Sequence, residues 1–223
     1  MTLRKKLASW IVVGGLVSLP VIVSACSTSA SAPKASDSTT MPMGDEPMAD
    51  HSMMMMMDLG PSDAEFDLRF IDGMILHHQG AVVMAESALQ NSQRDEIKQL
   101  AEEIIAAQQV EIDRMQQWRQ AWYPDASDEP IMYHAAMGHS MAMTSDMQAA
   151  MMMSGDLGAA DDEFDLRFIN GMIPHHEGAL AMAQDALEKS SRPDIQQLAQ
   201  DILATQQVEI DQMEQWRKDW YGQ

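Results

Sequence analysis

An internal repeat constrains the fold of this chain more than any other feature of its sequence. Residues 66–123 and 164–221 align without a gap at an offset of 98 positions, and 37 of the 58 aligned pairs are identical. Identity of this extent indicates a duplication. The period is too long, and the copies are too few, for a solenoid of short stacked repeats. The sequence therefore predicts one supersecondary unit that is built twice.

Each copy is predicted to be two helices joined by a short turn. Apolar residues recur at helical spacing along both halves of the copy. In the first copy, Ser62 and Glu65 have the spacing of a capping box, which predicts a helix start at Ser62. Asn91–Ser92 is the expected turn, and the second helix is expected to begin near Ser92. Pro124 should end that helix because proline cannot continue it.

One such hairpin cannot bury its apolar stripe alone, whereas two can pack together as a four-helix bundle. The predicted fold class is therefore all-α. The sequence leaves open whether the hairpins close on each other or each pairs with another chain. The expected segments are a signal peptide (1–25), a disordered Met/His-rich leader (26–61), a first hairpin (62–123), a Met/His-rich linker (124–160) and a second hairpin (161–223).

The N-terminus resembles a bacterial lipoprotein signal. Basic residues at positions 4–6 precede an apolar stretch, and two small residues precede Cys26, the only cysteine of the chain. In such signals cleavage falls before the cysteine, which then receives a lipid. Cys26 is thus the predicted lipidation site, and the mature protein is expected outside the cytoplasm (periplasm or cell envelope), tethered to a membrane. An ordinary secretory signal and an uncleaved anchor helix are the alternatives.

Charge and cysteine content exclude several function classes. The formal net charge of −20 argues against a nucleic-acid partner, since phosphate binding needs a basic surface. A single cysteine excludes a disulfide framework within one chain and any multi-cysteine zinc or iron–sulfur site.

Methionine is the unusual component, with 23 residues, of which 16 lie in two segments that precede the hairpins. The first segment is expected to be disordered, and the second to contain a short helix over 145–153. We expect packing in a core to explain few of these methionines. Their uses could be a soft-metal site, an adaptable apolar interface or an oxidation sink. The candidate ligands here are Met48, His51, Met53, His134, Met137, His139, Met141 and Met143.

Polar residues on the apolar faces of the hairpins are the other candidate ligands. A double histidine recurs in both copies with methionine three residues before and seven after its first member, and a glutamate lies on the following helix. Histidine nitrogen and thioether sulfur together suit copper. A buried His–Glu pair with core methionines is the structural alternative. The candidate ligands are Met74, His77, His78, Met84, Glu111 and Met115, with Met172, His175, His176, Met182, Glu209 and Met213.

Two rival metals fit this pattern less well. Di-iron bundles carry Glu-x-x-His, but Met74 and Met172 stand three residues before the double histidines. Zinc is disfavoured because cysteine is lacking and thioether is a weak ligand for it.

The same positions resemble the family called domain of unknown function 305, over roughly residues 62–223. The family's two motifs resemble F-I-x-x-M-I-x-H-H-x-x-A-x-x-M-A and Q-x-x-E-I-x-x-M. The first matches Phe70 to Ala85 and Phe168 to Ala183, and the second matches Gln108 to Met115 and Gln206 to Met213. The resemblance implies a ferritin-like four-helix fold. It also implies copper and silver binding, as in periplasmic members of the CopM type, which have Met-rich segments.

Together these observations predict an extracytoplasmic protein that binds copper as Cu(I) or Cu(II), with silver as a second candidate ion. Its role would be sequestration, tolerance or handover, with no catalytic residues. The leaders would capture metal and pass it to the hairpins. The expected partners are copper ions, a membrane through the lipid, copper exporters or cuproproteins, and further copies of the chain. The alternatives are a ferritin-like oxidase of Cu(I) or Fe(II) and a metal-free helical interaction module.

Overall fold

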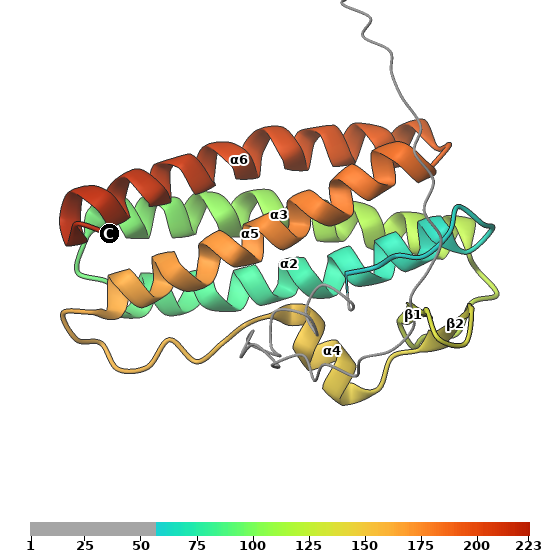
Figure 1. The fold of residues 1–223 in the computed structure, drawn as a ribbon, viewed down its shortest axis with the longest axis horizontal. Helices are drawn as coiled ribbons and strands as arrows, with labels where there is room; N and C mark the ends of the chain where they lie inside the picture. The colour runs from blue at the N-terminus through green and yellow to red at the C-terminus, as the bar shows by residue number, and fades with distance from the viewer. Residues whose placement is uncertain (1–56) are drawn as a thin grey trace, which may run out of the picture. The chain divides into compact units, whose positions relative to one another are not determined.

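The computed structural model describes residues 57–223, and the structural findings below concern this range. The all-α bundle that the sequence predicts is confirmed (Figure 1). The signal sequence, Cys26, Met48, His51 and Met53 lie outside the described residues. The elements are α2 (Phe66–Asn91), α3 (Asp95–Trp122), β1 (Ile131–His134), β2 (His139–Ala142), α4 (Ser145–Met152), α5 (Phe164–Lys189) and α6 (Pro193–Tyr221).

The two hairpins, α2–α3 and α5–α6, bury their apolar faces against each other. One core cluster combines Phe70 and Ile71 of α2 with Leu198 of α6. The other combines Leu100 of α3 with Phe168 of α5. Both clusters thus combine residues of the two hairpins, and the close backbone approach between the hairpins is that of α2 to α5. Of the two arrangements that the sequence left open, the described residues adopt the one that closes within the chain.

Two equivalent arginines clamp the ends of the bundle. Arg94, in the turn of the first hairpin, lies 3.6 Å from a carboxylate oxygen of Asp165 and 4.1 Å from the centre of the Trp220 ring. Arg192 repeats this in the second hairpin, 3.1 Å from Asp67 and 4.3 Å from the Trp122 ring. Each turn therefore holds both ends of the opposite hairpin.

The prediction of a capping box that starts a helix at Ser62 is wrong. Helix α2 begins at Phe66, and the Ser62 hydroxyl donates instead to the Lys189 carbonyl at 2.7 Å. The competing interaction is tertiary, because the Lys189 carbonyl belongs to the other hairpin. The buried guanidinium of Arg69 also donates to the Leu59 carbonyl at 2.6 Å and holds the incoming chain in an irregular turn. The next helix, α3, begins at Asp95, three residues after the expected position.

The prediction that Pro124 ends a helix is confirmed, and another proline stands at a helix start. Helix α3 ends at Trp122, before Pro124. Pro193 is the first residue of α6, where its missing N–H has no helical partner to lose. Among residues 57–223, none of the helices is both long and apolar enough to cross a membrane.

The linker between the hairpins contains more regular structure than expected. The short predicted helix is present as α4, and the Thr144 hydroxyl accepts a hydrogen bond from the backbone N–H of Met147 at its start. The antiparallel pair β1–β2 was not predicted. Met143 and Met151 are buried in the core cluster beside α2. The expectation that packing explains few linker methionines is therefore wrong for these two.

Candidate metal centre

Four histidines meet where α2 and α5 lie side by side. The rings of His77 and His175 are 3.8 Å apart between centroids, tilted by 47°. His78 lies 2.7 Å from a carboxylate oxygen of Glu111, and His176 lies 2.6 Å from Glu209. All four imidazoles are buried.

Helix geometry explains why adjacent histidines have different neighbours. Successive residues of an α-helix point about 100° apart. His77 therefore faces α5 of the other hairpin, while His78 faces α3 of its own, where it meets Glu111. The repeat reproduces this arrangement with His175 and His176, so two copies of one motif create a single cluster.

Burial and mutual repulsion keep the central pair neutral. Burial, followed by the nearby histidines, lowers the pKa of His77 well below its usual value. The same causes lower the pKa of His175 to about 3. Both rings are then uncharged at neutral pH, and neutral imidazole is the form that binds metal ions.

Several ring nitrogens of this cluster lack a hydrogen-bond partner within residues 57–223. They are both nitrogens of His77 and Nδ1 of His78, His175 and His176. The side-chain amide of the buried residue Gln108, one turn before Glu111, is unpaired in the same range. Buried polar atoms without partners are uncommon in folded proteins, and each calls for an explanation.

Six buried methionines of the helices form two groups that mix the hairpins. Met74 and Met115 share a core cluster with Met182 of the other hairpin, and Met84 shares the second cluster with Met172 and Met213. These methionines contact the opposite hairpin directly, because the Met182 sulfur lies against Gly73 of α2 and the Met84 sulfur against Gly171 of α5. Packing accounts for the burial of all six, and their role as ligands stays a prediction.

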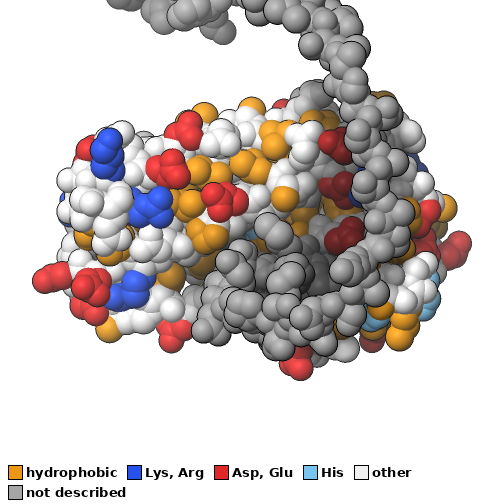
Figure 2. Space-filling model, in the orientation of Figure 1, with side chains coloured by type: hydrophobic (Ala, Val, Ile, Leu, Met, Phe, Trp, Pro, Cys, Tyr) orange, Lys and Arg blue, Asp and Glu red, His pale blue; other side chains and the backbone are white. Residues whose placement is uncertain are grey.

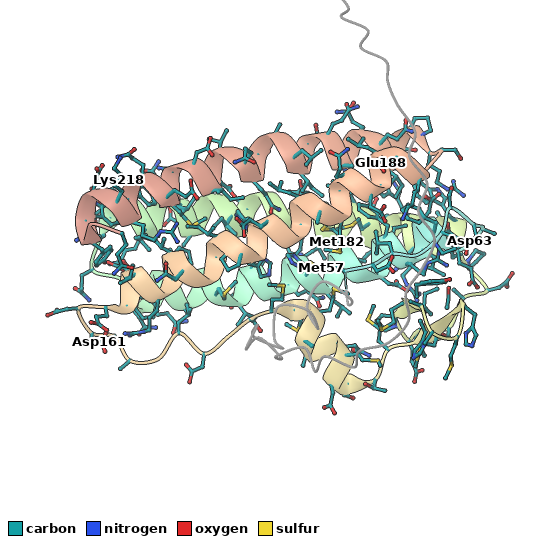
Figure 3. The ribbon with its side chains drawn as sticks, viewed as in Figure 1. Met57, Asp63, Asp161, Met182, Glu188 and Lys218 are labelled. Carbon is teal, nitrogen blue, oxygen red and sulfur yellow. The ribbon has the colours of Figure 1, made fainter. Side chains whose placement is uncertain are left out.

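Two segments outside the hairpins also reach the cluster. The carbonyl oxygen of Met152 lies 3.1 Å from Nε2 of His175, where the end of α4 packs on Gly80. On the equivalent side, Met57 packs on Gly178 (Figure 3), and a Cβ at Gly178 would lie 3.1 Å from Nε2 of His77. Met57 and Met152 were not among the predicted ligands. A signal was present, since a glycine stands three residues after the first histidine in both copies.

The remaining predicted ligands lie away from the four histidines. His134, His139 and Met141 belong to the β1–β2 pair, and Met137 lies in the turn between the strands. In the described part of the chain, no group of three or more His, Cys, Asp or Glu side chains is placed to hold a metal ion. A complete ligand set at the histidine cluster would therefore include methionine or backbone atoms.

The low pKa values of the central histidines predict that acid destabilises the metal-free protein. Between about pH 6.5 and pH 3 the unfolded chain binds a proton at His175 that the folded chain does not, and the lowered pKa of His77 acts in the same direction, so stability rises with pH and levels off above 6.5. Each pH unit lost within this window should cost roughly 1.4 kcal/mol per histidine. Urea unfolding at pH 7, 6 and 5 measures the slope, and a flat profile would contradict the assignment.

The fold and the site define a class of protein, a four-helix bundle made of two duplicated hairpins with a double histidine in each. The chain belongs to the DUF305 family, because the model of that family, described as a domain of unknown function, matches residues 67–217. This confirms the resemblance stated above.

Solved structures and a viral protein show similarity to the chain. The structure of CopM in the Cu(II)-bound form is 39% identical, with a TM-score of 0.56, over 70% of this chain and 97% of that chain. A DUF305 protein of Streptomyces coelicolor, proposed to be secreted, is 26% identical, with a TM-score of 0.52, over 66% and 88% of the respective chains. Protein L153 of Acanthamoeba polyphaga mimivirus is 45% identical over 49 residues, 22% of this chain and about a third (32%) of its own length.

Proposed function

We propose that this protein binds copper outside the cytoplasm, with the buried histidine cluster as its central site, for sequestration, tolerance or handover. The observation that carries the proposal is the set of five buried ring nitrogens without partners in residues 57–223. A buried polar atom left unpaired costs about 1–3 kcal/mol, so a purely structural role would leave much of this cost unexplained. A bound metal ion would supply the missing partner.

The chemistry of the donors favours a soft ion. Cu(I) and Ag(I) accept imidazole nitrogen and thioether sulfur, and neither donor has to lose a proton when the imidazole is already neutral. His77 and His175 are the proposed central ligands, with the six buried methionines of the helices as candidate sulfur donors. CopM, a structural neighbour, has been solved in Cu(I)-bound, Cu(II)-bound and Ag-bound forms, which supports the same choice of ions.

Glu111 and Glu209 are proposed to orient the outer histidines. A carboxylate that accepts the N–H of a metal-binding histidine fixes the ring and raises its basicity. In both pairs the carboxylate is hydrogen-bonded to Nε2, which leaves Nδ1 of His78 and His176 as the nitrogen that would bind a metal ion.

Replacement of Glu111 by Gln should weaken metal binding while the bundle stays folded. Loss of such a partner typically costs 10- to 100-fold in metal affinity, and we expect a loss in that range, about tenfold or more. Glu103→Gln is the matched control, because Glu103 is exposed on the same helix and its side chain accepts a hydrogen bond from Gln99, on the surface of α3. Cu(I) competition titrations of both variants measure the effect, and equal affinities would exclude an orienting role for Glu111.

Delivery and tethering complete the proposal. The lipoprotein-like signal would place the mature chain outside the cytoplasm, with Cys26 as its membrane anchor. The methionine-rich leader would then capture ions near the membrane. Exporters or cuproproteins are the proposed recipients, since thioether ligands exchange with one another.

Anaerobic titration of the full mature chain with Cu(I) against a colorimetric chelator tests the proposed function. We expect the protein to take copper from a competitor of micromolar affinity. If it takes none, the proposed function is wrong. Oxygen uptake on addition of Cu(I) or Fe(II) would instead indicate a metal oxidase.

A further inference from the structure

The β1–β2 pair brings two methionines and two histidines onto one face of a small sheet. In the antiparallel register Met132 is opposite Met141, and His134 is opposite His139. Directly opposite residues have Cβ atoms about 4.5–5.5 Å apart. Residues two apart on a strand point to the same face, about 7 Å from each other. All four side chains therefore converge on one side of the pair.

The other face of the pair is occupied by contacts with the bundle. It carries Tyr133 and Ser140, which are also opposite each other. The Ser140 hydroxyl accepts a hydrogen bond of 2.8 Å from the buried residue Arg69, whose guanidinium lies 5.4 Å from the centre of the Tyr133 ring. Gly60 packs on the same ring. These contacts fix the strands and determine which face holds the methionines and histidines.

The histidine end of this face is open to solvent, whereas its methionine end is partly covered. His139 is exposed, and Met132 packs at the edge of the core beside α2. Figure 2 shows histidine surface next to hydrophobic side chains near the end of the molecule where the strands lie. An ion could therefore enter from the histidine side and reach thioether sulfur held against the protein.

The hydrogen bonds of the two rings allow metal binding. His139 donates from Nδ1 to the Ser140 carbonyl at 2.8 Å, which leaves the lone pair of Nε2 free. His134 accepts the N–H of Met137 at Nδ1, 3.2 Å away. Binding of a metal ion through Nε2 of His134 requires the tautomer with its proton on Nδ1, which gives up the hydrogen bond from Met137. The Met137 N–H then still donates to the His134 carbonyl at 3.0 Å.

We propose that the β1–β2 pair is a second soft-metal site, in which Met132, His134, His139 and Met141 bind one Cu(I) or Ag(I). Two imidazoles and two thioethers suit these ions, and the flexible methionine side chain can adjust to the ion. This inference extends the proposed function to a second place in the same chain and needs no metal at the histidine cluster. Met137 is excluded because it lies in the turn, 65% exposed, and Met143 because it is 4% exposed in the core.

The test is a silver titration of the full mature chain, followed by NMR of ¹³C-labelled methionine methyl groups and by native mass spectrometry. We expect the Met132 and Met141 methyl signals and the His134 and His139 ring signals to shift together. The variant M132L/H134N/H139N/M141L should bind one silver ion fewer per chain. Met137→Leu is the matched control and should bind the full number.

The outcomes separate this inference from the proposed function. If the chain binds silver while the Met132 and Met141 signals stay in place, the β1–β2 site is wrong and the proposed function stands. If the chain binds no silver and takes no Cu(I) in the competition titration, both are wrong. An unchanged Met143 methyl signal in the fourfold variant shows that the linker still packs on α2. The signal shifts of the unaltered chain decide the matter if that variant fails to fold.

Discussion

Replacement of both His77 and His175 by leucine is expected to abolish Cu(I) binding at the histidine cluster and to raise the melting temperature of the metal-free protein. The two rings are buried and, within residues 57–223, three of their four nitrogens have no hydrogen-bond partner. Leucine removes these unpaired atoms. At about 1–3 kcal/mol for each unpaired group, the melting temperature should rise by several degrees. The copper affinity of this site should fall by at least about 100-fold, since two proposed ligands are lost.

Replacement of the outer histidines, His78 and His176, is a control in which the stability of the metal-free protein should fall and not rise. His78→Leu/His176→Leu leaves the carboxylates of Glu111 and Glu209 without their histidine partners. A largely buried carboxylate without a partner is costly, so the metal-free protein should lose about 1–3 kcal/mol per site. Thermal unfolding with and without Cu(I) compares the two double variants. A purely structural role for His77 and His175 would be indicated if their replacement lowered the melting temperature and left copper affinity unchanged.

Gly80→Ala should detach the linker from the histidine cluster. A Cβ at Gly80 would overlap the backbone carbonyl of Met152, and backbone cannot move aside as a side chain can. We expect a loss of about 1–3 kcal/mol, as for other overpacked sites. The hydrogen bond between His175 and the Met152 carbonyl should be lost as well. Hydrogen exchange of α4, compared with that of α5, measures the release.

Alanine substitutions at two other glycines are controls for the loss of stability expected of Gly80→Ala. A Cβ at Gly73, on the same helix, would have its nearest neighbours at 3.8 Å, which is ordinary contact. Gly73→Ala should therefore be neutral or stabilise the helix by up to about 1 kcal/mol. At Gly178 the obstacle is the flexible side chain of Met57, so Gly178→Ala should cost less than Gly80→Ala. Equal exchange rates in α4 for Gly80→Ala and Gly73→Ala would contradict the close packing inferred here.

The sequence predicts the bundle because its two determinants are local and repeated. Apolar spacing indicates helices, and a duplicated hairpin needs a second hairpin to cover its apolar face. The pairing of His78 with Glu111 follows for the same reason, since a buried glutamate on one helix needs a partner on its neighbour. These features require no knowledge of how the two hairpins cross.

Features that depend on the crossing could not be predicted from spacing. The structure groups Met84 with Met172 and Met213 of the other copy, and the spacing within one copy does not predict this grouping. The capping box at Ser62 does not form because the Ser62 hydroxyl donates instead to the Lys189 carbonyl of the other hairpin. The β1–β2 pair was missed because a strand of four residues carries too little alternation to be distinguished from a loop.

The most direct test of the central claim is a crystal of the mature chain, grown with Cu(I) under anaerobic conditions and measured at the copper absorption edge. We expect an anomalous peak within ligand distance of His77 and His175, between α2 and α5. Copper peaks confined to other parts of the chain, with these two rings still in contact and metal-free, would contradict this expectation.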